Sequence, residues 1–324
     1  MSVDQMLARE WFEFPASTLA GSGVYPPSPV PPGNGPNNVM AAWSGGALDT
    51  LRNSLLIHGG GHGDYAGNEI YAFYLLTGLW DRIWGPTPNA DIPPLSPSPP
   101  FGGTIETYLN GDPAAVHSYC GLLYLPGRDK FFRACGSGWS GGGGGLRGTW
   151  LWDPTNLWVR QTDNPQNHVT PMMVYDAQTD RVYGTGDKGL FHEWDPKLNI
   201  WTPRASLGAV TVGDFEMGAA IDPDNRLFVC AGNNGLFAIN LNTWAVTEPA
   251  STGGANIISK RGPSLEWDPI SRRIICWYGG TSVYSLNTST WVFTEITAAA
   301  TNTVTPPSES ATRILGAFPM SKFR

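Results

Sequence analysis

The stretch Gly189-LFHEWDPKLNI-Trp201 decides the fold, because versions of it recur along the chain. In each copy a short aliphatic and aromatic run passes through turn-forming residues and ends at a tryptophan. The last four tryptophans are 43, 43 and 47 residues apart, and the first interval, 78, equals one repeat plus an insertion. Such a period, built from short strands and turns, is typical of β-propeller blades. The other copies are Glu69-IYAFYLLTGL-Trp80, Gly148-TWLWDPTNL-Trp158, Gly235-LFAINLNT-Trp244 and Ser282-VYSLNTST-Trp291.

The composition favours many short strands joined by tight turns. Among 324 residues there are 40 glycines and 28 prolines, whereas charged residues make up only 15%. Hydrophobic residues reach 41%, which is enough for a large core. We therefore expect one all-β domain spanning residues 1–324.

Each repeat is expected to hold four strands, which we name a to d in chain order. Strand a ends in a turn rich in Asp, Pro and Asn, which supplies the backbone angles of a hairpin. Strand b follows, a glycine-rich b–c loop leads to strand c, and the tryptophan opens strand d. Five repeats can be read in full, at about residues 39–85, 117–162, 168–206, 213–250 and 260–297.

Glycine pairs and aromatic residues recur at fixed places in these repeats. Gly59-Gly60 and Gly279-Gly280 end strand b, whereas Thr185-Gly186 and Ala231-Gly232 depart from the double glycine. With the closing tryptophans, this pattern resembles the kelch family of β-propellers over about residues 39–296. The resemblance implies a kelch-like propeller whose function lies in the loops of one face. Strand c contributes the aromatic residues Tyr71, Trp150, Phe191, Phe237 and Tyr284.

The two ends of the chain are expected to complete the ring. Residues 9–14 read as an outer strand without a blade, and residues 311–324 read as a strand a with its turn. Pairing the N-terminal strand with the C-terminal strand would close six blades, with seven as the alternative. Either residues 1–38 provide further strands, or this last blade is thin and its edge is a candidate assembly contact with a partner.

Four ionisable residues occupy equivalent positions, each seven residues before the end of a strand a. We expect them, together with Arg261 and Arg313, around the mouth of the central channel. Three of the four, His117, His168 and Asp214, are candidate metal ligands. The alternative is that polar strand starts simply line a wet channel. The four equivalent residues are His117, His168, Asp214 and Lys260.

Two b–c loops on the same face carry candidate binding residues. The first, residues 58–69, is a dense polar cluster, for which a turn capped by its own Asp and Asn is the alternative. The second, residues 136–148, is a glycine run without the lysine of a phosphate-binding loop, so we exclude a nucleotide site. The Pro-rich insertion 85–116 is expected to overhang this face as a rim or lid. The candidates in these loops are His62, Asp64, Tyr65, Asn68, Glu69, Trp139 and Arg147.

None of the four cysteines shows metal-ligand spacing. Cys135, Cys230 and Cys276 occupy equivalent positions at the end of strand b, where we expect small buried side chains. Cys120 and Cys135 would face each other across one strand pair, so a disulfide is an option there.

Composition and charge exclude several classes of function. The net charge is −7 and no Lys/Arg-rich run occurs, so we expect no nucleic-acid partner. No apolar run approaches the roughly 18 residues of a membrane span, and the first residues lack the features of a secretory signal. We expect a soluble protein. Isolated propellers of this type are known among tailed-phage virion proteins, and this resemblance implies a virion-associated role as an expectation.

The first functional hypothesis is a binding or structural propeller that presents one loop face to a glycan or protein partner. In it, Trp139 would stack on a sugar ring and the other side chains would surround it. The remaining candidate binding residues are Asp64, Tyr65, Arg147, Lys260 and Arg261.

The alternative is a polysaccharide lyase. The loop His58-GGGHGDYAGNE-Ile70, followed by His117 and Tyr119, is similar to the propellers of some polysaccharide lyases, including ulvan lyases. That similarity implies β-elimination at a uronate, with His117 or Tyr119 as base or acid and His62 as partner. Arg133, Lys260 or Arg261 would then neutralise the carboxylate.

A copper radical oxidase of the galactose oxidase kind is not supported, because no pair of histidines near a tyrosine forms the required set. We therefore expect no cofactor, with a structural divalent metal as the alternative.

Overall fold

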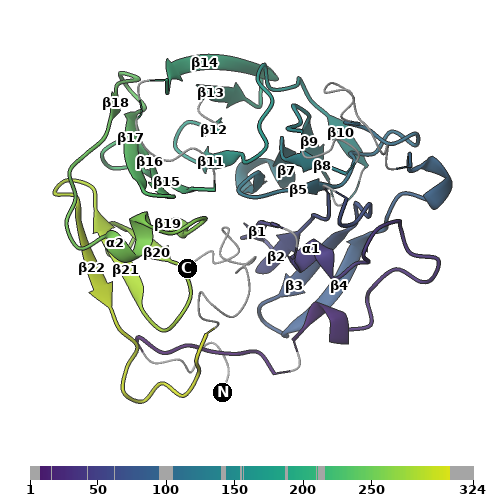
Figure 1. Cartoon of the computed structure of the whole chain (residues 1–324), viewed down its shortest axis with the longest axis horizontal. Coiled ribbons are helices and arrows are strands. Elements are labelled where there is room, and N and C mark those ends of the chain that lie inside the picture. Colours follow the sequence, from purple (N-terminus) through teal and green to yellow (C-terminus); the bar gives the residue numbers. More distant parts are fainter. Residues whose placement is uncertain are drawn as a thin grey trace. The chain divides into compact units, whose positions relative to one another are not determined.

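The computed structural model describes residues 8–15, 17–41, 43–61, 63–94, 105–139, 144–153, 155, 157–186, 189–208, 210 and 216–306. These residues form five four-stranded antiparallel sheets (Figure 1). Each sheet coincides with one of the five repeats read from the sequence. The all-β propeller class is therefore confirmed.

The sheets follow the a–b–c–d order of the repeats. The first contains β1 (Gly46–Asp49), β2 (Ser54–Ile57), β3 (Ile70–Tyr74) and β4 (Leu79–Trp84). The second contains β6 (Leu122–Leu125), β7 (Lys130–Ala134), β9 (Thr149–Trp152) and β10 (Trp158–Arg160). The third contains β11 (Met172–Asp176), β12 (Arg181–Thr185), β13 (Leu190–Asp195) and β14 (Ile200–Ser206). The fourth contains β15 (Gly218–Asp222), β16 (Leu227–Gly232), β17 (Gly235–Asn240) and β18 (Val246–Thr247). The fifth contains β19 (Ser264–Asp268), β20 (Arg273–Trp277), β21 (Val283–Asn287) and β22 (Val292–Ile296).

The other elements are short. A two-stranded sheet pairs β5 (Val116–His117) with β8 (Ser137–Gly138). The α-helices are α1 (Asn38–Ala41) and α2 (Ala255–Ile258), and 3-10 turns occur at Leu19–Gly21, Asn89–Asp91 and Pro126–Arg128. No helix among the described residues has both the length and the apolar character to cross a membrane.

The chain divides into two compact units. One comprises residues 17–209 with the first three sheets, and the other comprises residues 1–16 and 210–324 with the last two. In the first unit β6 lies between β1 and β11, so the innermost strands of neighbouring sheets are side by side. In the second unit β15 lies beside β19 in the same way. The single domain over residues 1–324 stays a prediction.

A left-handed residue closes every a–b turn. The fourth turn residue has a φ near +50° in all five sheets, at Asn53, Asp129, Asp180, Arg226 and Arg272. Such angles are sterically unfavourable for residues other than glycine, asparagine and aspartate.

Aspartates at the end of strand a stabilise four of these turns. Oδ1 of Asp49 accepts hydrogen bonds from two turn amides, and Asp222 and Asp268 do the same with their own turns. Asp176 accepts one such bond, from the amide of Gln178. The second sheet has Leu125 at this position instead, and its turn begins at Pro126. The Asp-rich turns of the sequence are thus the hairpins they were expected to be.

The closing tryptophans do not all open strand d. Trp80, Trp158 and Trp201 lie in strands, as expected. Trp244 and Trp291 instead occupy left-handed turn positions, with φ of 63° and 58°, and their amides bond back to the carbonyls of the residues that end strand c. The prediction is wrong for these two, because in the last two sheets strand d begins one or two residues later.

Neighbouring a–b turns are also joined by side chains within each unit. Arg52 contacts Asp129 through two parallel hydrogen bonds of 2.7 Å, which lower the pKa of Asp129 to about 2. Arg128 contacts Asp180 at 2.6 Å in the same unit. In the other unit Arg272 contacts Asp224 at 2.7 Å. Each pair connects one sheet to the next, so the a–b end of the sheets is cross-linked by charge.

Apolar clusters fill the space between adjacent sheets. The cluster between the second and third sheets includes Phe132, Trp194 and Trp201, and the Trp194 ring packs in a tilted arrangement against each of the other two. Val229, Leu265 and Leu286 belong to the corresponding cluster between the fourth and fifth sheets. All four cysteines are buried free thiols, so the small-residue interpretation is confirmed and the Cys120–Cys135 disulfide is not formed.

The sixth blade stays a prediction. Residues 311–324, including Arg313, lie outside the described residues. Residues 8–15 form no strand. They lie against the fifth sheet, where Trp11 Nε1 donates to the carbonyl of Thr281 at 3.0 Å and the ring packs 5.4 Å from Trp277. The proposed assembly contact at this seam is likewise untested.

Asp222 offers a test of how much the turn aspartates stabilise the fold. Its buried carboxylate accepts from the amides of Asp224 and Asn225, and also from the Thr288 hydroxyl in the next sheet. Asp222→Ala should lower the free energy of unfolding by about 1–3 kcal/mol, because the buried Thr288 hydroxyl and two part-buried turn amides lose their acceptor. Chemical denaturation measures this.

Asp268→Ala is the matched control. Among the described residues, the Asp268 carboxylate accepts only from its own turn, at Ile270 and Ser271, and these bonds are exposed. Asp268→Ala should therefore lower the free energy of unfolding by less than Asp222→Ala does. Equal losses for the two variants would show that the bond to Thr288 contributes nothing.

Candidate functional site

In the first unit, β5 and β8 bring the start of strand a against the b–c loop of its own repeat. His117 lies on β5 opposite Ser137 on β8. The first b–c loop meets the same strand at Gly61, where a Cβ would lie 2.2 Å from the His117 amide nitrogen. Because Gly61 also has a φ of +55°, only glycine fits here. The strand start and both loops therefore share one face, as the repeat alignment predicts.

His117 and Asp64 form a hydrogen-bonded pair at this point. Nε2 of His117 lies 2.8 Å from Oδ2 of Asp64. The His117 side chain is only 2% exposed, whereas that of Asp64 is 29% exposed. The Trp43 ring packs 5.0 Å from the imidazole and the Tyr119 ring lies 6.2 Å from it. A carboxylate bonded to one imidazole nitrogen fixes the ring orientation, which is the arrangement that a general base requires.

The predicted metal set is not assembled by the described residues. His168 is completely buried, and its ring packs 6.1 Å from that of His192, so it does not lie at an open rim as expected. Burial lowers the pKa of His168 to about 4. Asp214 lies outside the described residues, as does His62. Within the described part of the chain, no group of three or more His, Cys, Asp or Glu side chains could hold a metal.

Tyr65 is a structural residue of the first b–c loop. It is completely buried, and its hydroxyl donates to Glu69 Oε1 at 2.8 Å, as does that of Tyr71 at 2.9 Å. Burial raises the pKa of Glu69. The expectation that Tyr65 contacts a ligand is therefore wrong. The interpretation of this loop as a self-bonded turn fits better.

The insertion covers the two loops and buries Trp139. The side chain of Trp139 is 1% exposed and packs with Ile92, Tyr108 and Ala115 of the insertion. Asn68 also anchors the insertion, since its amide donates to Thr87 and to the carbonyl of Pro113, both at 2.9 Å. Trp139 cannot stack on a sugar, so that prediction is wrong.

Two predicted arginines do not line an open site in the way the sequence suggested. Arg147 is exposed, and its Nε donates to the carbonyl of Asn164 at 2.8 Å. Arg133, a predicted carboxylate clamp, is completely buried. It cannot reach a substrate at the surface, and that part of the lyase hypothesis is wrong.

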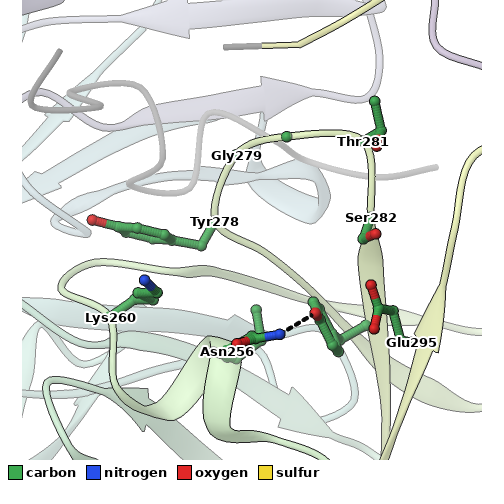
Figure 2. Close-up of a pocket in the computed structure, with 10 residues that line it drawn as sticks. Asn256, Lys260, Tyr278, Gly279, Thr281, Ser282 and Glu295 are labelled. Carbon is green, nitrogen blue, oxygen red and sulfur yellow. Dashed lines mark hydrogen bonds between the residues drawn. The ribbon is translucent and has the colours of Figure 1, made fainter. Parts of the chain in front are cut away.

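In the second unit, the fifth sheet carries a pocket of about 300 Å³. It is bounded by α2, by the b–c loop from Tyr278 to Ser282, and by strand β22 at Glu295 (Figure 2). Lys260 and Tyr278 lie on one side of it, and Ser282 and Glu295 on the other. The Lys260 amine is 5.8 Å from the centre of the Tyr278 ring. The pocket thus combines a cation, a carboxylate, aromatic rings and small hydrogen-bonding side chains.

Neighbouring elements hold the pocket walls in place. Asn256 Nδ2 donates to the Tyr284 hydroxyl at 2.9 Å. The b–c turn of the fourth sheet, with Asn233 and Asn234 both left-handed, donates its amides to the carbonyls of Lys260 and Ile258. Trp11 fixes the b–c loop of the fifth sheet from outside, through its bond to Thr281. Arg261 is exposed and pairs with Glu216 at 3.5 Å, so it does not line the pocket.

Sequence reasoning found Lys260 but missed Tyr278, Asn256 and Glu295. Tyr278 directly precedes Gly279-Gly280, so the glycine pair was the available signal. Nothing in the sequence indicates that α2 would bring Asn256 to the same place.

Comparisons with known proteins assign this chain to no family. No protein-family model matches the chain, and no curated protein is similar enough to count as a relative. Among solved structures, virginiamycin B lyase from Staphylococcus aureus is similar with a TM-score of 0.47 and 10% identity. The match covers 82% of this chain and 72% of that one.

Proposed function

We propose that this protein is a binding propeller, and that the pocket of the fifth sheet binds one acidic sugar unit of a glycan. The observation that carries the proposal is the joint presence of Lys260, Tyr278 and hydrogen-bonding side chains around one pocket. Aromatic rings suit the apolar face of a sugar, and precisely placed polar groups give orientation. A lysine adds attraction for a carboxylate.

The polar groups are suited to sugar hydroxyls. The exposed Asn256 and Glu295 together supply donors and acceptors, and Ser282 supplies both. The backbone contacts described above hold these walls in position, which reduces the ordering cost of binding. A volume of about 300 Å³ is at the lower end for small-molecule sites, which suits one sugar unit with its neighbours outside.

The biological setting that we propose is the surface of a virion, where the protein would act in decoration or adhesion. Its support is the resemblance of the sequence to virion propellers. A protein partner at the same face is the alternative to a glycan.

Binding to a uronate-containing glycan array tests the pocket. Tyr278→Ala should weaken binding about fivefold or more, since stacking contributes on the order of 1 kcal/mol. Lys260→Gln should remove the preference for uronates over neutral glycans. Tyr278→Phe retains the ring and should retain most of the affinity.

Arg261→Gln is the matched control for Lys260→Gln, because Arg261 is adjacent in sequence but lies outside the pocket. It should bind as the wild type does. If the Lys260 and Tyr278 variants also bind as the wild type does, or if no glycan binds at all, the pocket is not the binding site.

A polysaccharide lyase is the second candidate, and the His117–Asp64 bond favours it. In this reaction the His117–Asp64 pair would take the C5 proton of a uronate through Asp64, because the Asp64 side chain is 29% exposed and that of His117 only 2%. The C–H electrons would form the C4–C5 double bond, and the C4–O bond would break. The departing oxygen would then take up a proton, for which Tyr119 is the candidate donor. The carboxylate clamp that this chemistry needs is not identified among the residues of the first unit.

Ultraviolet absorbance of the unsaturated product tests this reaction. With uronate polysaccharides, the wild type should produce the absorbance, His117→Ala should abolish it, and Asp64→Asn should reduce it about tenfold or more. His192→Ala, which removes a buried histidine elsewhere, serves as the control. An inactive wild type rejects the lyase, and an active His117→Ala variant rejects the assigned base.

A further inference from the structure

Arg133 is a buried arginine that has no hydrogen-bond or ion-pair partner among the described residues. It lies on β7, opposite Leu122 on β6 and Trp150 on β9. Its side chain is 0% exposed, and none of its three nitrogens has a hydrogen-bond acceptor among the described residues. Burying an unpaired charge in this way is strongly unfavourable, so a compensating group is required.

The side chains on the same face of the second sheet cannot supply that group. Alternation along β7 places Phe131 beside Arg133, and their strand partners on β9 are Trp152 and Trp150. Phe131 and the tryptophans Trp150, Trp152 and Trp158 pack in one cluster between the first and second sheets. The indole nitrogens of all three tryptophans are buried, and none has an acceptor in the part of the chain that the structure describes. Arginine and tryptophan side chains only donate, so this region has an excess of donors.

The carboxylate that acts most strongly on Arg133 is engaged elsewhere. Glu106 attracts the guanidinium electrostatically, but its oxygens accept from the amides of Arg147 at 2.6 Å and Gly148 at 3.0 Å. No ion pair joins Glu106 to Arg133 among the described residues. Burial lowers the pKa of Arg133 to about 10, so the guanidinium stays charged at neutral pH.

His58 is another polar neighbour, besides Tyr108 and Cys135, which are also neutral at neutral pH. Its Nδ1 lies 3.3 Å from the carbonyl of Glu69, so Nδ1 carries the hydrogen and Nε2 is left as an acceptor. Burial and the charge of Arg133 lower the pKa of His58 to about 3, so the ring is neutral. A neutral imidazole can accept one hydrogen bond, but it cannot balance a cation.

We infer that the Arg133 guanidinium binds a small inorganic anion, chloride in a physiological medium, between the first and second sheets. An anion supplies both the missing negative charge and the missing acceptors. Since Arg133 is completely buried, a monatomic ion fits better than phosphate or the carboxylate of a glycan. The anion would neutralise the interface between two sheets that carry the His117 and Asp64 loops.

Thermal unfolding of the full chain in sodium chloride and in sodium gluconate, at equal ionic strength, tests the inference. Binding to the folded state alone should raise Tm in chloride by a few degrees. Arg133→Met should lose this difference. Arg128→Met, which removes an arginine already paired with Asp180, should keep it.

Bromide-soaked crystals of the wild type provide a second measurement that does not depend on a variant folding. An anomalous peak beside the Arg133 guanidinium is expected. Equal Tm values in the two salts, or water alone beside Arg133, would overturn the inference. A peak without any Tm difference would mark an adventitious ion and would overturn it as well.

Discussion

The left-handed residue at the end of each a–b turn is the constraint on which the sheets depend. Strands a and b pair in register only if the chain reverses over four residues, and the fourth must then adopt a positive φ. The aspartate at the end of strand a supports this reversal in four sheets by accepting the turn amides. Arg226 and Arg272 adopt the conformation although their side chains disfavour it, so the register outweighs the local cost.

The two ends of the strands consequently have different properties. At the a–b end, aspartate turns and the pairs Arg52–Asp129, Arg128–Asp180 and Asp224–Arg272 join neighbouring sheets within each unit. At the b–c end, glycines let loops approach strand starts, as Gly61 does at His117. Ion pairs therefore cross-link the sheets at the a–b end, whereas at the b–c end the loops bring side chains from different strands close together. This division places the candidate binding and catalytic groups at the b–c end.

Local features of the fold could be predicted from the sequence, and long-range burial could not. Turn residues such as Asp176 and Asp222 act on amides two or three positions away, so their role is visible in the sequence. Trp139 and Tyr65 look accessible in glycine-rich loops, but the insertion and Glu69 bury them. Lys260 was found by its equivalence to His117, whereas Asn256 reaches the pocket only through α2. Trp244 and Trp291 lie in turns because strand d begins one or two residues after them, which the sequence period does not reveal.

Substitution of Arg226 tests the turn constraint most directly. Arg226 has a φ of 54°, and its backbone carbonyl accepts from the amide of Leu241 at 2.8 Å whatever the side chain is. In chemical denaturation, Arg226→Val should be less stable than Arg226→Gly by about 1–2 kcal/mol or more, because both variants lack the arginine side chain and differ in the cost of the positive φ. Equal stability of the valine and glycine variants would contradict the account.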